Sequence, residues 1–235
     1  MKKTAAIIIV LCNLLAQSAL AQDTPEYRME IGAGGGLMGY LGDFNNSITK
    51  DLQPMGGVFA RYNFNSYTAM RLDLNYGKMK GSSKDVKTYY PPYSETPYEF
   101  NNTLVDLSLT YEYNLWPYGT GKEYRGAKPL TPFIFGGLGA SYVNTKSNYA
   151  EKKKNIIAPG ALIGIGLKYK ANERLNIGLD FAMHFSMSDE LDGAKDPYGI
   201  TSSGPFKNTD CFSTLQLTVS YSFWARCRTC HNEDE

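Results

Sequence analysis

Residues 175–187 read Leu175-Asn-Ile177-Gly-Leu179-Asp-Phe181-Ala-Met183-His-Phe185-Ser-Met187, and every odd-numbered side chain among them is apolar. The even-numbered positions carry Asn, Gly, Asp, Ala, His and Ser. Alternation with a period of two is the pattern of a β-strand that has one apolar face and one polar face. A soluble strand is commonly about 5–6 residues long, whereas a tilted strand needs about 9–11 residues to cross a membrane. The length and the pattern together predict a membrane-spanning strand.

Seven further segments show the same alternation less cleanly. They comprise residues 27–33, 58–64, 70–76, 105–114, 133–143, 157–169 and 213–223. The total of eight is an even number, as in the single-chain barrels of bacterial outer membranes. Since the hydrocarbon core holds no water for backbone N–H and C=O groups, strands that span it must close into a barrel. The sequence therefore predicts an all-β fold, an eight-stranded antiparallel transmembrane β-barrel, with a secreted β-sandwich as the alternative.

The connectors between these segments are of two kinds. Residues 65–66 and 171–173 form short connectors. The long connectors are residues 38–53, 79–102, 144–155 and 188–210. Short periplasmic turns and longer outer loops are typical of outer-membrane barrels, so a periplasmic N-terminus puts all four long connectors outside. Residues 115–128 are an exception, because they form a long connector on the periplasmic side.

The N-terminus has the features of a secretory signal peptide. A basic start at Met1-Lys2-Lys3 precedes a mostly apolar stretch at residues 5–15 and the small-x-small cleavage pattern Ala19-Leu20-Ala21. We therefore expect the chain to reside in the cell outer membrane. The expected regions are a signal peptide at 1–21, the barrel at 22–224 and a periplasmic cysteine-containing tail at 225–235.

The composition excludes several classes of protein. The 24 Lys+Arg nearly balance the 23 Asp+Glu, so no basic field indicates a nucleic-acid partner. After residue 22 no apolar run approaches the roughly 18–20 residues of a membrane-spanning helix. Aromatic residues gather near the strand ends, where the interfacial girdles of a barrel belong. They are Tyr62, Tyr76, Tyr111, Tyr113, Tyr169, Tyr221 and Trp224.

Charged residues occupy the polar positions of the predicted strands. They would be costly in contact with lipid, so we expect them to face the lumen and to pair with one another. The expected lumen network comprises Arg61, Arg71, Asp73, Asp106, Glu112, Asp180 and His184, and Arg174 is expected on the same face. Because side chains fill the interior of an eight-stranded barrel, a porin or nutrient channel is disfavoured.

Three motifs that could carry chemistry are better explained without it. Gly34–Gly39 matches the dinucleotide-binding glycine pattern, but no helix signal follows it. Asp180, His184 and Ser186 share the lumen face, yet four residues of strand span about 13 Å, which is too long for a proton relay. Cys227-Arg-Thr-Cys230-His231 has haem-attachment spacing without an apolar pocket, and it supplies too few ligands for zinc. We expect no catalytic residue, no cofactor and no metal.

The mature chain would keep three cysteines, Cys211, Cys227 and Cys230, in an oxidising compartment. An odd number leaves at least one cysteine outside any intramolecular disulfide. A Cys227–Cys230 disulfide and a disulfide to a partner protein are both open. Cys211 begins the last strand on the outer side, about a membrane thickness from the tail, and is not expected to pair with it.

Six short segments, in their order along the chain, resemble the PorG-like outer-membrane proteins of Bacteroidetes. The resemblance covers about residues 27–230, and it departs from the family pattern at Ser188 and Glu190, where Thr and Tyr are expected. The segments are Gly39-Tyr-Leu-Gly-Asp43, Arg61-Tyr-Asn-Phe64, Leu74-Asn-Tyr-Gly-Lys78, Glu112-Tyr-Asn114, Thr131-Pro-Phe133 and Ser188-Asp-Glu-Leu-Asp192, followed by a cysteine-rich end.

The resemblance implies a non-enzymatic component of the type IX protein secretion system, which also supports gliding motility. Its expected partners are a periplasmic ring lipoprotein of the PorK type, the associated PorN-like ring protein and outer-membrane lipid, with no nucleic acid and no small-molecule substrate. We expect the ring to dock on the connector 115–128 and the tail. The partner-binding residues would be Cys227, Cys230, Trp116, Tyr118 and Tyr124. A small lipid-modifying enzyme that uses His184, and a surface adhesin that uses the long outer loops, are the alternatives.

Overall fold

The computed structural model describes residues 27–41, 50–85, 97–119, 128–148, 154–188, 191 and 210–225. The strands in this part of the chain are β1 (Tyr27–Leu41), β2 (Gln53–Asn63), β3 (Thr68–Ser82), β4 (Glu99–Asn114), β5 (Leu130–Thr145), β6 (Lys154–Lys170), β7 (Leu175–Ser186) and β8 (Cys211–Ala225), and a short 3-10 helix, η1 (Ser83–Asp85), follows β3. Among these residues no helix has the length and apolar character needed to span a bilayer. The expected signal peptide at 1–21, Tyr124, Cys227 and Cys230 lie outside the described residues.

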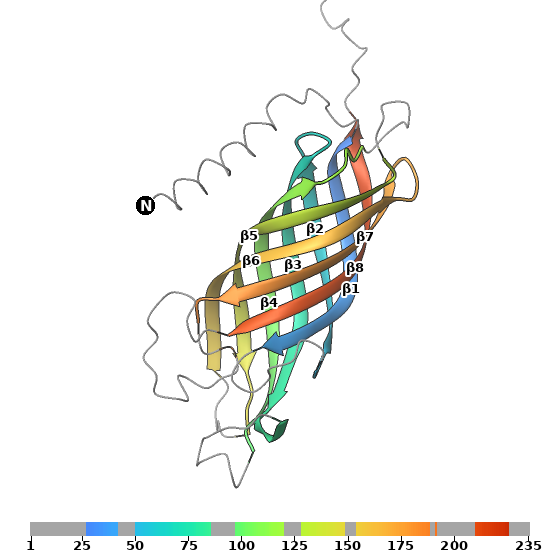
Figure 1. Cartoon of the computed structure of the whole chain (residues 1–235). Helices are drawn as coiled ribbons and strands as arrows, with labels where there is room; N and C mark the ends of the chain where they lie inside the picture. Colours follow the sequence, from blue (N-terminus) through green and yellow to red (C-terminus); the bar gives the residue numbers. More distant parts are fainter. Residues whose placement is uncertain are drawn as a thin grey trace, which may run out of the picture.

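The strands form one closed barrel in sequence order from β1 to β8, with every neighbouring pair antiparallel (Figure 1). Closure comes from the pairing of β1 with β8, which runs from Tyr27↔Ala225 to Leu41↔Cys211. A closed sheet has no edge, so its backbone groups pair within the sheet, as a bilayer requires. This arrangement confirms the predicted eight-stranded antiparallel barrel and excludes the β-sandwich.

Alternate side chains divide into an apolar outer face and a largely polar lumen. Large apolar side chains are exposed on every strand, among them Ile31, Val58, Leu74, Leu107, Leu138, Ile163, Leu179 and Leu217. A soluble monomer rarely exposes so extended an apolar surface, whereas lipid is the natural surroundings of such a belt. The chain is therefore an outer-membrane β-barrel protein.

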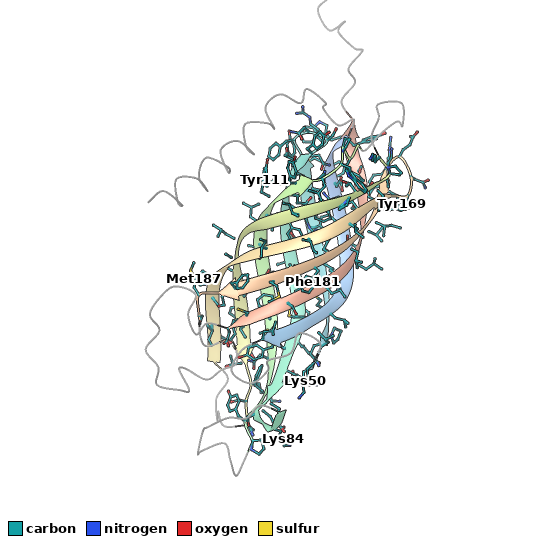
Figure 2. All side chains as sticks on the ribbon, viewed as in Figure 1. Lys50, Lys84, Tyr111, Tyr169, Phe181 and Met187 are labelled. Atoms are coloured by element: carbon teal, nitrogen blue, oxygen red, sulfur yellow. The ribbon has the colours of Figure 1, made fainter. Side chains whose placement is uncertain are left out.

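The two ends of the barrel differ in their connectors. The β2–β3 and β6–β7 turns and the connector from β4 to β5 lie at one end, here called the periplasmic end. The four long connectors start from the opposite, outer end, which is the lower end in Figure 1. Figure 2 shows Tyr111 and Tyr169 near the periplasmic end and Lys50 and Lys84 near the outer end. An aromatic belt at a membrane interface is typical of such barrels.

Several strands extend further at the outer end than the alternation predicts. β1 continues to Leu41 instead of ending at residue 33, and β3 continues to Ser82 instead of ending at residue 76. Glycines and lysines hide the alternation there, but pairing with the neighbouring strand continues, as far as Ser82↔Glu99 between β3 and β4. As a result, the β3–β4 hairpin projects beyond the rest of the barrel wall (Figure 1).

Candidate functional site

The lumen contains two layers of side chains. The layer nearer the periplasmic end is a charge network of Glu30, Arg61, Arg71, Asp73, Glu112, Lys168 and Asp180, all of them buried. The layer nearer the outer end is an apolar plug formed by Met38, Tyr40, Met55, Met79, Tyr98, Phe100, Leu104, Val143, Ala158, Leu191 and Phe212. The lumen is therefore filled rather than open, as expected for a barrel of eight strands.

Glu112 of β4 is the centre of the charge network. Its carboxylate lies 2.5 Å from Lys168 Nζ, 2.9 Å from Arg61 Nε and 3.7 Å from Arg71 Nη1. These three cations come from three other strands, β6, β2 and β3. Because a buried charge is costly unless it is paired, Glu112 compensates much of the positive charge that these strands bring into the lumen.

Glu30 and Lys168 belong to this network although the sequence reasoning did not select them. Glu30 accepts hydrogen bonds from Arg61 Nη1 at 2.6 Å, from Asn63 Nδ2 at 2.8 Å and from Ser220 Oγ at 3.2 Å. Both residues sit on the polar face of strands that the alternation had predicted. A charged side chain on the polar face of a predicted strand, even near the end of that strand, was the sequence signal that could have identified them as lumen residues.

Arg71 links the remaining two carboxylates of the network. Its guanidinium lies 2.6 Å from both Asp73 Oδ1 and Asp180 Oδ2. The ring of Phe59 packs beneath the network, with Arg71 Cζ 4.3 Å and Arg61 Cζ 4.9 Å from its centroid. Such cation–π contacts stabilise a guanidinium where water is excluded. The structure thus brings Arg61, Arg71, Asp73, Glu112 and Asp180 together in the lumen.

Asp106 and His184, the other two expected lumen residues, lie apart from the charge network. Asp106 Oδ2 is 3.8 Å from His184 Nδ1, and its Oδ1 accepts a hydrogen bond from Ser141 at 2.7 Å. His184 Nε2 is 3.4 Å from Thr214 Oγ1, and the imidazole stacks on Phe212 with centroids 4.2 Å apart.

This arrangement does not make a hydrolytic site. Asp180 is bound to Arg71, not to His184, so the Asp180–His184–Ser186 group does not assemble. Thr214, His184 and Asp106 have the order of a triad, but their spacing is loose and the adjoining cavity is only about 10 Å³. That volume holds about one water molecule and no substrate. Among the described residues, no group of three or more His, Cys, Asp or Glu side chains is placed to hold a metal.

Leu191 closes the outer mouth of the barrel. It comes from the connector between β7 and β8, and its side chain is fully buried in the plug. Asn102 Nδ2 donates to the Leu191 carbonyl at 2.6 Å, and the Leu191 N–H donates to Asp210 Oδ2 at 2.9 Å. Tyr40 OH donates to Asp210 Oδ1 at 2.6 Å. Asp210 therefore ties an outer connector to the wall of β1.

We predict that Asp210→Ala destabilises the barrel by about 1–3 kcal/mol, because it removes the carboxylate that accepts hydrogen bonds from the buried Tyr40 hydroxyl and Leu191 N–H. The measurement is the urea midpoint of the protein refolded into lipid vesicles. Asp51→Asn is the matched control, since Asp51 is exposed and has a φ of 56°, a conformation that Asn tolerates. Equal midpoints for the two variants would show that Asp210 does not hold the plug.

Tyr118 covers the periplasmic mouth. Its N–H donates to the Ser66 carbonyl at 2.9 Å and its hydroxyl donates to Asn176 Oδ1 at 2.8 Å, so the connector after β4 is tied to β7 across the opening. Burial raises the pKa of the phenol well above its ordinary value, which keeps it a neutral donor. Only 3% of Tyr118 is exposed. The side chain therefore lies within the mouth of the barrel, and the partner contact expected from the sequence stays a prediction.

Trp116, by contrast, is 41% exposed at the periplasmic rim. Its backbone N–H donates to Thr131 Oγ1 at 3.1 Å, and Thr131 Oγ1 donates back to the Trp116 backbone carbonyl at 3.0 Å. Lys128 Nζ lies 4.7 Å from a Trp116 ring centroid, and the Lys128 N–H donates to the Pro117 carbonyl at 2.9 Å. These hydrogen bonds hold the backbone at Trp116 beside the barrel mouth, and the Lys128 ammonium packs on its exposed indole.

Trp224 is a second exposed indole at this end, 67% accessible and close to the end of β8. Its φ of 64° places it in the left-handed region, which is strained for an aromatic residue. Arg174, expected in the lumen, is instead exposed in the β6–β7 turn, where it donates to Tyr221 OH at 2.9 Å and to Tyr27 OH at 3.3 Å. The alternation of side-chain direction ends where the strand ends, so it does not predict which way the side chain of a turn residue points.

Comparison with known proteins adds a family and several similar barrels. The model of the family described as "Domain of unknown function (DUF6089)" matches residues 2–232. No curated protein matches the chain.

Among solved structures, Ail of Yersinia pestis is 11% identical with a TM-score of 0.48, covering 84% of this chain and 99% of its own. The β-barrel domain of Pseudomonas aeruginosa OprF is 16% identical with a TM-score of 0.45, covering 84% and 98%. A major outer membrane protein of Thermus thermophilus is 12% identical with a TM-score of 0.47, covering 83% and 99%. Likenesses this distant transfer no activity, ligand or partner to this chain.

Proposed function

The chain belongs to the DUF6089 family, and from that premise we propose that it is a non-enzymatic anchor in the outer membrane. In this proposal it is a component of the type IX protein secretion system that holds a periplasmic lipoprotein ring and its associated ring protein to the membrane. The secretion system comes from the PorG-like resemblance of the sequence. The anchoring role is supported by the sealed lumen.

The sealed lumen is the observation that carries the proposal. Tyr118 covers the periplasmic mouth, the network around Glu112 fills the adjoining half, and Leu191 plugs the outer mouth. In the described part of the chain, side chains therefore fill the lumen at three levels, which argues against a path for cargo. Its surfaces for interaction are its two ends and its lipid-facing wall. The burial of His184 behind Phe212 likewise favours a structural role over the enzymatic alternative.

The periplasmic end has the features of a docking surface. Trp116 and Trp224 are exposed there, and tryptophan is among the residues that most often dominate the binding energy of protein interfaces. The backbone at Trp116 is held by Thr131 and its ring contacts Lys128, which reduces the entropy lost when a partner covers it. Cys227 and Cys230 follow β8 in the sequence and could offer a covalent link in an oxidising compartment.

Co-purification from detergent-solubilised outer membrane tests the proposal. The expected result is a periplasmic lipoprotein that is recovered with the wild-type chain and identified by mass spectrometry. Trp116→Ala is expected to lower its recovery by about tenfold or more, as the loss of an interface anchor does. If a disulfide links the two proteins, a non-reducing gel shows a joint band that a reductant separates. The double variant Cys227→Ser with Cys230→Ser is expected to lack that band.

Tyr142→Ala is the matched control, because it removes an aromatic side chain of similar exposure at the outer end of β5. It is expected to leave recovery unchanged. A folded barrel that purifies without any periplasmic partner would overturn the anchor proposal. Altered lipid modification in a His184→Ala strain with the complex intact would favour the enzyme instead.

A further inference from the structure

A polar hollow lies on the outside of the barrel wall at the outer end, where β3, β4 and β5 extend past the apolar belt. Its volume is about 490 Å³, within the range of small-molecule sites. The residues that matter for its chemistry are Asp51, Lys80, Glu99, Asn101, Lys146 and Asn148. None of them belongs to the lumen or to the periplasmic surface proposed for docking.

Toward the outer end of each of these strands, the lipid-facing apolar side chains give way to the polar side chains of the hollow. On β3 the exposed positions change from Leu74 and Tyr76 to Lys78 and Lys80. Along β5 they change from Leu138 and Tyr142 to Lys146, which directly follows the strand. Since tyrosine marks the boundary between hydrocarbon and headgroups, the lysines stand at the level of the outer-leaflet headgroups.

The described charges in and beside the hollow are mainly positive. Lys80 and Lys146 line it, and Lys78 is exposed on the same face of β3. Of its two carboxylates, Glu99 is paired with Lys84 at 2.8 Å, which leaves Asp51 as the opposing charge. An anionic group is therefore favoured here.

Hydrogen bonds hold the backbone of the hollow in place. The Asn101 N–H donates to the Lys146 carbonyl at 2.9 Å, and the Asn148 N–H donates to the Glu99 carbonyl at 3.1 Å. The Asn148 side chain accepts from the Glu99 N–H at 2.9 Å and donates to the Pro97 carbonyl at 2.7 Å. These bonds continue the β4–β5 pairing past the end of β5 and place the Lys146 backbone beside Asn101. On the other side of Asn101, β3–β4 pairing places the Lys80 backbone, so both lysine stems start from a paired sheet.

We propose that this hollow, the outer-rim site, binds the phosphorylated sugar headgroup of an outer-leaflet glycolipid. Lys80 and Lys146 hold the phosphate, because an ammonium group is a strong donor to phosphate oxygens. The exposed Asn101 amide faces the sugar hydroxyls, and the acyl chains continue down the wall past Tyr76 and Tyr142. The proposal is independent of the periplasmic docking function, since the two sites lie at opposite ends of the barrel.

The test measures binding of lipid A, an acylated glucosamine disaccharide bisphosphate, to the purified full chain in detergent micelles. A lysine near a membrane surface contributes about fivefold to the binding of an anionic lipid. Lys80→Ala with Lys146→Ala is therefore expected to weaken binding by about 25-fold. Asp51→Asn, which removes the opposing charge, is expected to strengthen it.

Lys128→Ala with Lys170→Ala is the matched control, because it removes the same charge at the periplasmic end, and it is expected to leave binding unchanged. Lipid A without its phosphates is expected to bind the wild-type chain weakly. Its affinity should match that of intact lipid A for the Lys80→Ala, Lys146→Ala variant. Equal binding of phosphorylated and dephosphorylated lipid, or equal binding by both double variants, would overturn the proposal. Displacement of the lipid by millimolar inorganic phosphate would identify free phosphate as the ligand and overturn the assignment to lipid.

Discussion

Glu112→Gln is expected to destabilise the folded barrel by about 3–5 kcal/mol, the cost of removing one partner from a buried ionic network. Glutamine keeps the shape of the side chain but removes its charge. Lys168 at 2.5 Å and Arg61 at 2.9 Å would then share the remaining carboxylates of the lumen, and Arg71 at 3.7 Å would lose part of its compensation. Both contact pairs have side chains that are at most 4% exposed, so water does not screen them.

Urea unfolding in lipid vesicles measures this effect, with heat-dependent electrophoretic mobility as a second report of the folded barrel. Glu99→Gln is the matched control, because it makes the same chemical change in an exposed pair with Lys84, where the expected loss is within about 1 kcal/mol. If the two variants unfold at the same urea concentration, the network around Glu112 does not stabilise the fold.

Gly36→Ala is expected to disturb the closure of the barrel. A Cβ at this position would clash with the Leu215 carbonyl oxygen and lie 2.8 Å from Gln216 Cα, both of them backbone atoms of β8. Backbone atoms inside a paired strand cannot rotate away as a side chain does, so β1 and β8 must separate. Overpacking of this kind costs about 1–3 kcal/mol and sometimes more. Because β1 and β8 are the first and last strands, the substitution weakens the pairing that closes the sheet into a barrel.

Gly35→Ala provides an unusually close control, since it adds the same methyl group one residue earlier. A Cβ at Gly35 points outward and meets only the Met55 carbonyl oxygen at 3.7 Å, an ordinary contact. Alanine there is expected to be neutral or to stabilise by up to about 1 kcal/mol, because it restricts the unfolded chain. Refolding yield into vesicles and the urea midpoint both report the difference. A Gly35→Ala variant as unstable as Gly36→Ala would mean that close approach of β1 to β8 is not the cause.

Most lumen residues of the candidate site could be predicted from the alternation of polar and apolar side chains alone. Arg61, Arg71, Asp73, Glu112 and Asp180 were placed in the lumen because each falls on the polar face of an alternating strand. Parity tells which face a side chain takes, but it does not tell which side chains meet across the lumen. The contact of Asp180 with Arg71, 109 positions earlier in the chain, therefore had no signal in any local pattern.

The side-chain directions in the connectors were harder to predict from the sequence, for a different physical reason. Tyr118 and Trp116 are two residues apart in one connector, yet one seals the barrel mouth and the other is exposed. No periodicity applies outside a strand, so their directions are set by hydrogen bonds to Ser66, Asn176 and Thr131 from other parts of the fold. Arg174 was misplaced for the same reason, because it lies in a turn.

The sequence by itself determined the eight strands, their even number, the lipid-facing and lumen-facing sides and the location in the outer membrane. These properties follow from a two-residue period, which each strand carries within its own sequence. Only the tertiary structure decided how the lumen charges pair, that Leu191 and Tyr118 seal the two mouths, and that Lys80 and Lys146 line one hollow. Those relations depend on the register and closure of strands far apart in the chain, which long-range hydrogen bonding fixes and no local pattern encodes.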